Sequence, residues 1–217
     1  MSVIKKKRGD KTEVKERVVV AARKAFSLNG IRTVTMDDIA ASLSISKRTL
    51  YELFHDKEEL LLEVVKAHRD TTREYMMKVA SEAENVLEVI LKLYQKNAED
   101  FQNINRKFFE DLSKYPKVRA FINASREETA EAAIECFRKG VEQGIFRNDI
   151  NYEIVRVIVT DEIDLLMQSE ICQSYSLAEV YEAIVFMHMR GISTEKGRKI
   201  VDDFLLNLKG IEHNKNG

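Results

Sequence analysis

Apolar residues recur at every third or fourth position along most of the chain, which predicts amphipathic helices. The first helix is expected from about Lys11 to Asn29, and Gly30 follows it as a residue that commonly ends helices. A second periodic region spans residues 86–112 and is expected to break near Asn103 to Asn105. The chain of 217 residues contains only eight glycines and one proline. Pattern and composition together predict an all-α fold.

Capping residues mark the starts of further helices. Ser125 with Glu128 and Ser176 with Glu179 have the spacing of a capping box, and Asn151 and Thr194 precede two more apolar-periodic segments. The segment from Asn151 to about Cys172 begins with enough β-branched residues to form a strand. Because its apolar pattern continues to Met167 without a turn, we predict a helix there.

The stretch Val34–Leu60 contains three helix starts, at Thr35, Ser46 and Asp56. The first two predict helices of about two turns each, joined by a short connection at Leu43 to Ile45. Such short helices must cross steeply and share a small apolar core, which is the arrangement of a helix-turn-helix. The second helix of this motif can lie in the major groove of DNA.

The side chains expected on the outer face of that second helix suit DNA. Lys47 and Arg48 can reach guanine edges or phosphates, Thr49 can contact a base or a methyl group, and Tyr51 can bind a phosphate. Lys57 opens the following helix, where a cation opposes the helix dipole, so we expect it to bind a phosphate. The alternative for each cation alone is an ordinary solvated charge. The candidate DNA-binding residues are Thr35, Ser46, Lys47, Arg48, Thr49, Tyr51 and Lys57.

The formal charge of the whole chain is −1, but it is unevenly distributed. Residues 1–57 contain thirteen basic and seven acidic residues, a charge of +6, and the remainder contains 22 basic and 29 acidic residues, a charge of −7. A polyanionic partner is therefore expected for the N-terminal part alone.

Residues from about Glu16 to Glu63 resemble the DNA-binding domain of the tetracycline-repressor (TetR) family, also called TetR/AcrR. The family pattern "F…G" followed by "T…IA…S…LY..F..KE.L" is met by Phe26 and Gly30, Thr35, Ile39-Ala40, Ser46, Leu50-Tyr51, Phe54, Lys57-Glu58 and Leu60. Ser44 and Arg48 depart from it, because many members have glycine at each place. A serine with positive φ in the turn would cost about 1 kcal/mol.

The resemblance implies two domains, a helix-turn-helix DNA-binding domain (1–56) and a larger helical ligand-binding and dimerisation domain (57–217). It implies a homodimeric, sequence-specific transcriptional regulator that binds a double-stranded DNA operator. The predicted function is a repressor that an unknown small molecule releases from DNA. The alternative is a constitutive DNA-binding or helical scaffold protein without an effector.

Two further sets of residues are candidates for sites in the second domain. Aromatic and methionine residues that could line an apolar ligand pocket, or simply belong to the core, are Met76, Met77, Tyr94, Phe101, Phe108 and Phe137. A two-fold interface is expected from the helices at about 151–172 and 194–208, since both are too apolar to face water. Its candidate residues are Ile158, Leu165, Val201, Phe204 and Leu208.

No pattern in the sequence indicates catalysis. The chain has no nucleophile–base set, no glycine-rich phosphate loop and no clustered metal ligands, so we expect no enzymatic activity, no metal and no cofactor. Cys136 and Cys172 are expected to be ordinary reduced thiols. No apolar run is long enough to span a membrane, and a cytoplasmic protein is expected.

Overall fold

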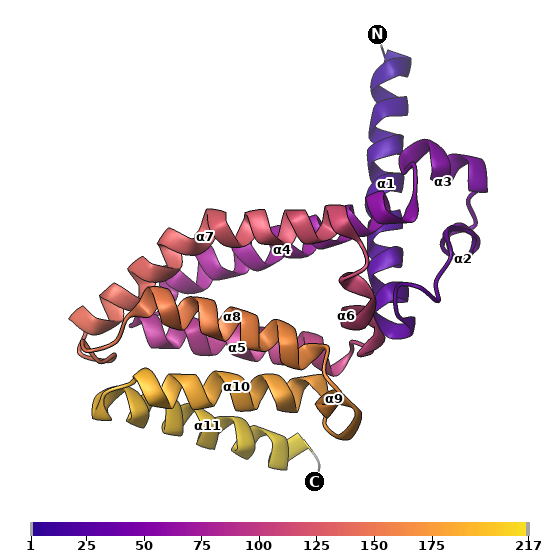
Figure 1. The fold of residues 1–217 in the computed structure, drawn as a ribbon. Helices are drawn as coiled ribbons and strands as arrows, with labels where there is room; N and C mark the ends of the chain where they lie inside the picture. Colours follow the sequence, from indigo (N-terminus) through magenta and orange to yellow (C-terminus); the bar gives the residue numbers. More distant parts are fainter. Residues whose placement is uncertain (1, 216–217) are drawn as a thin grey trace. The chain divides into compact units, whose positions relative to one another are not determined.

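The computed structural model describes residues 2–215, with the side chains of residues 11–208. The chain divides into two compact units, the first formed by Met1–Arg73 with Asn103–Ser125 and the second by Glu74–Gln102 with Arg126–Gly217. Within the described residues the regular elements are all helices, and a single isolated bridge joins Phe146 and Ser193 (Figure 1). The predicted all-α fold is confirmed.

Unit 1 contains the N-terminal helices and a later segment that returns to them. Its helices are α1 (Ser2–Asn29), α2 (Met36–Ser42), α3 (Lys47–Leu53), the first part of α4 (Lys57–Glu82), α6 (Lys107–Leu112) and the first part of α7 (Pro116–Glu142). Both α4 and α7 continue into unit 2 without a break.

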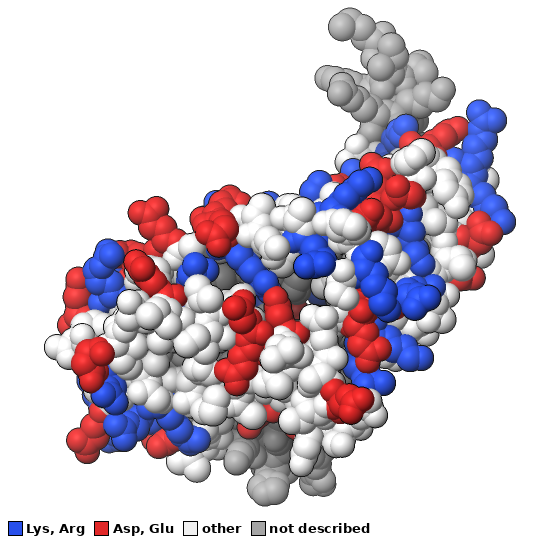
Figure 2. Space-filling model, viewed as in Figure 1, with Lys and Arg blue, Asp and Glu red and all other residues white. Residues whose placement is uncertain are grey.

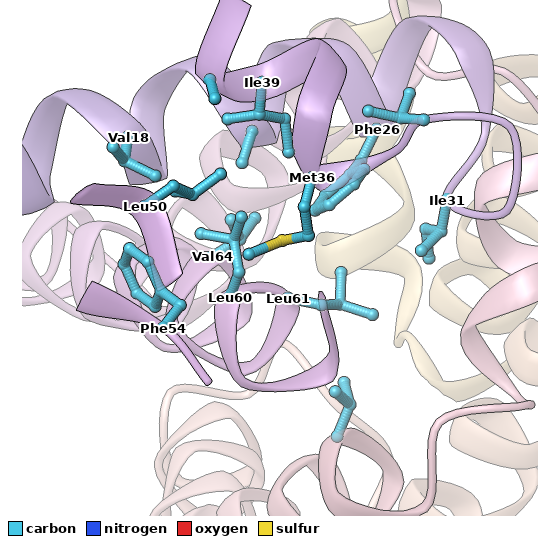
Figure 3. Packing of buried hydrophobic residues seen from close by; sticks show 14 residues of the cluster. Val18, Phe26, Ile31, Met36, Ile39, Leu50, Phe54, Leu60, Leu61 and Val64 are labelled. Atoms are coloured by element: carbon cyan, nitrogen blue, oxygen red, sulfur yellow. The ribbon is translucent and has the colours of Figure 1, made fainter. Parts of the chain in front are cut away.

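One apolar core holds unit 1 together. Val18 and Phe26 of α1, Ile39 of α2, Leu50 of α3 and Leu61 of α4 are fully or almost fully buried and point toward one another (Figure 3). Val118 of α7 belongs to the same buried cluster, so the returning segment completes this core. The short helices α2 and α3 are therefore fixed by tertiary packing, because helices of two turns are unstable alone.

Unit 2 contains α5 (Val86–Gln102), α8 (Tyr152–Met167), α9 (Ile171–Ser174), α10 (Leu177–Ile192) and α11 (Glu195–Lys215), with the rest of α4 and α7. Helix α10 is its centre, since it packs against α5, α8 and α11. Tyr94 of α5 stacks on Tyr181 and meets Phe186 edge-on, with ring centroids 5.7 Å and 4.7 Å apart. Aromatic pairs of this geometry stabilise a core beyond their buried area.

Several expected helix boundaries are confirmed. Helix α5 ends at Gln102 and α6 begins at Lys107, so the region 86–112 breaks where predicted. The Ser176–Glu179 capping box is present, and the segment after Asn151 is helical. This helix ends at Met167, earlier than the expected Cys172, which lies in a separate short helix, Ile171–Ser174. Helix α1 already includes residues before Lys11, whose side chains, among them Lys5 to Arg8, lie outside the described ones.

The helix start predicted at Ser125 is wrong. Helix α7 runs unbroken from Pro116 to Glu142, and Ser125 lies within it. The Ser125 hydroxyl donates to the Phe121 carbonyl one turn earlier at 2.9 Å, a bond that serine forms inside helices. Pro116 is the true start, because proline at the first helical position lacks only an N–H group that would have no helical partner.

Candidate nucleic-acid interface

Helices α2 and α3 form the predicted helix-turn-helix, and side-chain caps fix where each begins. The Thr35 hydroxyl accepts from the Asp38 N–H at 3.1 Å and the Asp38 carboxylate accepts from the Thr35 N–H at 2.8 Å, which completes a capping box. The Ser46 hydroxyl accepts from the Thr49 N–H at 3.0 Å. Both caps satisfy N–H groups that the first turn of a helix leaves unpaired.

The turn between these helices contains a strained residue. Ser44 has φ of +54°, the only positive φ of a non-glycine residue in the described part of the chain. A side chain disfavours this left-handed conformation, because its Cβ atom comes close to the following carbonyl oxygen. The expected strain at Ser44 is therefore present.

Helix α3 presents cationic and aromatic side chains to solvent. The side chains of Lys47 and Arg48 are 68% and 88% exposed, and Tyr51 is exposed beside them. Lys47 pairs with Asp37 of α2, whose carboxylate raises the pKa of the Lys47 ammonium, and Arg48 pairs with Glu52 at 2.9 Å. Basic and acidic side chains accordingly mix over α2 and α3 (Figure 2).

These exposed ion pairs leave the cations available to a stronger partner. An ion pair between solvent-exposed charges contributes about 0–1 kcal/mol to stability. Lys47 and Arg48 can therefore leave Asp37 and Glu52 and bind a phosphate or a guanine at little cost in free energy. By contrast, the hydroxyls of Thr35 and Ser46 are engaged in caps, which gives them a role in shaping the motif. Thr49 is half-buried, and its hydroxyl lies 2.8 Å from the Ser46 hydroxyl.

Lys57 lies differently from its predicted phosphate contact. Its ammonium donates to the carbonyls of Ile31 and Val34 at 2.9 and 2.8 Å and approaches the Arg32 carbonyl at 3.4 Å. Burial lowers the pKa of Lys57 below its usual value, and the charge of Asp111 partly offsets this effect. The loop between α1 and α2 therefore occupies the donors that a phosphate would need.

Sequence reasoning missed Asp111 of α6, which is 6% exposed. Its carboxylate accepts from the Arg32 N–H at 2.8 Å and from the Lys114 ammonium at 3.0 Å. These bonds outweigh burial and hold the pKa of Asp111 below its usual value. The sequence did contain a signal, because Asp111 lies on the same helical face as the apolar Phe108 and Leu112.

The candidate pocket residues are not gathered at one place. Tyr94 and Phe101 belong to the aromatic cluster of unit 2, and Phe137 stacks on Tyr152 with ring centroids 4.9 Å apart. Phe108 packs on the core of unit 1, and Met77 is exposed. Met76 is also partly exposed, at 39%.

Two shallow depressions occur on the described surface of unit 2, and neither is lined by the candidate pocket residues. One, of about 400 Å³, lies beside Asp161, Asp164 and Leu165 of α8. The other, of about 420 Å³, lies between α10 and α11 beside Phe186, Met187 and Leu205.

The candidate interface residues separate into two groups. Ile158 and Leu165 are 50% and 70% exposed on α8. Val201 of α11 is fully buried within its own protomer, which leaves its side chain no surface for a partner. Phe204 packs on Tyr94 and Phe186, and Leu208 is half-buried, because this face of α11 covers the core of unit 2.

An apolar stripe of α8 remains uncovered. Ile154, Val157, Ile158 and Leu165 are all exposed on one side of the helix, with the exposed Asp161 among them. Figure 2 shows the corresponding uncharged surface, interrupted by acidic side chains. Helix α10 runs antiparallel beside α8 (Figure 1), and Glu162 of α8 faces His188 at 3.3 Å. Met187, the residue before His188 on α10, is also exposed.

Among the described residues, no helix has the length and apolar content needed to cross a bilayer. The described His, Cys, Asp and Glu side chains form no group of three or more that could hold a metal ion.

Comparison with known proteins identifies a family from the N-terminal helices. Residues 18–64 match the family model for bacterial regulatory proteins of the tetR family. The transcriptional repressor KstR2 of Mycobacterium tuberculosis (strain CDC 1551) is 23% identical over 142 residues, which are 63% of this chain and 70% of that protein.

Two solved structures share the fold over most of their length. The TetR-family protein CprB of S. coelicolor A3(2) aligns with a TM-score of 0.71 and 18% identity over 93% of this chain and 98% of that chain. The repressor FadR of Thermus thermophilus, solved in complex with lauroyl-CoA, aligns with a TM-score of 0.56 and 22% identity over 82% of this chain and 94% of that chain.

Proposed function

Because its residues 18–64 place this chain in the tetR family of bacterial regulatory proteins, we propose that it is a dimeric repressor released from its operator by a small molecule. The observation that carries the proposal is the helix-turn-helix of unit 1, whose capped second helix presents Lys47 and Arg48 to solvent. A helix of this kind is the part of the motif that reads the major groove. The repressor KstR2, which matches over 63% of the chain, supports a role in transcription.

In the proposed complex, α3 lies in the major groove, and its side chains contact different parts of the DNA. Arg48 binds a guanine edge, and Lys47 and Tyr51 bind phosphates or bases beside it. Thr49 lies one turn from the cap and contacts a base or a methyl group. Thr35 and Ser46 hold the two helices at the angle that this contact requires, through the caps they form.

The exposed apolar surface of α8 and α10 supports dimerisation through these two helices. Two copies related by a two-fold axis would cover Ile154, Ile158, Leu165 and Met187 with the same residues of the partner, as in an isologous interface. Two α8–α10 pairs form a four-helix bundle, the arrangement that the family resemblance implies. Helix α11, which the sequence favoured for this role, is instead occupied with its own core.

The effector is proposed to be a small, largely apolar molecule. FadR of Thermus thermophilus, which has the same fold, was solved in complex with lauroyl-CoA, and this complex supports an effector with an apolar chain. Helix α4 runs unbroken through both units, so an effector bound in the second part of the chain can move the first. A coupling of about 1–3 kcal/mol suffices to switch DNA binding, and it is reciprocal.

The remaining parts of the proposal concern location and chemistry. We propose a cytoplasmic protein without enzymatic activity, because the relatives are transcriptional regulators. A constitutive DNA-binding protein is the second candidate. Its specific support is that the aromatic and methionine residues expected to line a pocket are dispersed over separate clusters.

The proposed function is tested by DNA binding with and without candidate effectors. The DNA is a duplex from the region beside the protein's own gene, and the compounds are a series of acyl-CoA thioesters and free fatty acids. We expect tight, salt-dependent binding of the duplex that at least one compound weakens. Binding that no compound changes, with no thermal shift of the protein, would favour the constitutive alternative. Absence of DNA binding would contradict the proposal.

A further inference from the structure

The loop that joins α1 to α2 has to satisfy its backbone polar groups without help from a helix. Ile31 and Val34 are 0% and 5% exposed, so the loop between them is anchored in the core of unit 1. Backbone carbonyls in such a place need partners, because an unpaired buried carbonyl loses the hydrogen bonds that water would supply. This loop also sets where α2 begins, and with it the orientation of the helix-turn-helix.

Lys57 supplies the partners on one side of this loop. An ammonium group has three donors and no acceptor, and Lys57 directs them to the carbonyls of Ile31, Arg32 and Val34. This arrangement explains a cation in the first turn of α4, where the helix dipole disfavours one. The partial negative charges of three carbonyls and the nearby carboxylates of Asp111 and Asp38 compensate the ammonium.

Helix α6 holds the same segment from another direction. The Asp111 carboxylate accepts from the Arg32 N–H at 2.8 Å, and the carbonyl of the same residue faces Lys57, so Arg32 is held from both sides. Asn105 donates its own N–H to the Ser27 carbonyl at 2.7 Å, and its side-chain amide donates to the Leu28 carbonyl at 3.3 Å. A Cβ atom on Gly30 would lie 2.9 Å from the Cβ of Lys107, so the end of α1 and α6 are in close contact.

We propose that Lys57 and Asp111 are positioning residues for DNA recognition, which clamp the α1–α2 loop and do not contact DNA. The inference rests on the proposed DNA-binding function. It assigns to Lys57 a role other than the phosphate contact that the sequence suggested. The clamp acts on specific recognition, since a shifted α2 and α3 lose base contacts while the basic surface that attracts any DNA is unchanged.

The salt dependence of DNA binding separates the two roles of Lys57. Loss of a phosphate contact reduces the slope of log affinity against log salt by about one. Lys57→Met should leave this slope unchanged and lower the affinity for a duplex from beside the protein's own gene by about tenfold, as expected when buried carbonyls lose their donor. Affinity for a scrambled duplex of the same length should change much less. Lys47→Met, the same substitution at an exposed lysine of α3, is the matched control and should reduce the slope.

A second pair of variants tests the carboxylate. Asp111→Asn keeps an oxygen that can accept from the Arg32 N–H and should retain most of the specific affinity, whereas Asp111→Leu should lose it. Hydrogen exchange of the Arg32 amide in the free protein measures the clamp without DNA. We expect slow exchange in the wild type and in Asp111→Asn, and fast exchange in Asp111→Leu.

The outcomes are distinguishable. A reduced salt slope for Lys57→Met, with equal losses on both duplexes, would identify a phosphate contact and overturn the clamp. Fast exchange of the Arg32 amide in the wild type would also overturn it. A wild-type protein that binds neither duplex but protects the Arg32 amide would contradict the DNA-binding function and leave the clamp in place. If Lys57→Met does not fold, the Asp111 variants and amide exchange decide.

Discussion

Ser44 is the residue at which the helix-turn-helix departs most clearly from relaxed backbone geometry. Its φ of +54° lies in the left-handed region, where a Cβ atom crowds the following carbonyl. Ser44→Gly should therefore raise the free energy of unfolding by about 0.5–1 kcal/mol, the relief of strain less the greater freedom of glycine in the unfolded chain. Urea denaturation measures it.

The control for this prediction is Ser42→Gly, two residues earlier and within α2. Glycine in a helix is destabilising, so this variant should lose about 0.5–1 kcal/mol. Destabilisation by both substitutions would mean that Ser44 is not strained in solution.

Arg48 is the residue we expect to contribute most to base recognition. Its exposed guanidinium is held only by an exposed pair with Glu52. Arg48→Ala should weaken binding to the operator-bearing duplex by about 1–3 kcal/mol and relax the preference at one position in each half-site. Arg138→Ala, which removes another exposed arginine far along the chain in α7, should change neither. Equal effects of the two variants in a gel-shift titration would remove Arg48 from the interface.

At the scale of single residues, the sequence predicted the caps better than the contacts. Thr35, Ser46 and Ser176 cap the helices expected of them, because a cap depends on neighbours three positions away. Lys57 and Asp111 meet the α1–α2 loop across 23 to 79 positions of sequence, and no local pattern encodes such a meeting. Their roles required the fold.

The contribution of the α2 capping box to the stability of unit 1 can be tested directly. Thr35→Ala should destabilise unit 1 by about 1 kcal/mol, the usual cost of losing an N-cap. Thr33→Ala, an exposed threonine of the preceding loop, is the matched control and should be close to neutral. Thermal unfolding followed by circular dichroism distinguishes the two.

The contribution of this box should also depend on pH. Hydrogen bonds from Thr35 hold the pKa of Asp38 below its usual value of 3.8. A carboxyl with a lowered folded-state pKa stabilises fully above its unfolded-state pKa, and this contribution is lost as the pH falls through the folded-state pKa. The difference in stability between wild type and Thr35→Ala should therefore narrow below about pH 4. A difference that stays constant down to pH 2 would contradict this role of Asp38.

Helices α7 and α11 are the elements for which the sequence pattern gave a different expectation from the structure. The Ser125–Glu128 spacing resembles a capping box, yet the backbone continues as helix and the hydroxyl turns back to Phe121. The apolar face of α11 looked suitable for a partner, but Val201 is buried and Phe204 lies against Tyr94 and Phe186. An apolar stripe shows that a helix packs, and it does not show against what.

For the whole molecule, the central architectural prediction is the α8–α10 dimer. Leu165→Glu should yield a folded monomer, since the side chain is 70% exposed in one protomer and would place a charge in the proposed interface. The DNA affinity of this variant should fall sharply, because a monomer has one helix-turn-helix and contacts a single half-site. Leu206→Glu of α11, equally exposed at 69%, lies outside this surface and should remain dimeric. Sedimentation velocity at micromolar concentration gives the answer. A dimeric Leu165→Glu variant together with a monomeric Leu206→Glu variant would place the interface on α11.

The division of the chain explains why its second part was harder to predict than its first. The core of unit 1 uses helices that are close in sequence, with one returning segment that includes Val118. The packing of unit 2 depends on contacts such as Tyr94 with Glu182, 88 positions apart, which periodicity does not define. The predicted boundary between residues 56 and 57 remains a prediction about function, and the compact units divide within α4 and α7 instead.

Sequence-specific DNA binding by unit 1 is the claim on which the whole account depends. Fluorescence anisotropy of a labelled duplex from beside the protein's own gene, titrated at several salt concentrations and compared with a scrambled duplex, tests it most directly. We expect the first duplex to bind about a thousandfold or more tightly than the second, with an affinity that falls steeply as salt rises. Equal affinity for the two duplexes, or no binding of either, would contradict the account.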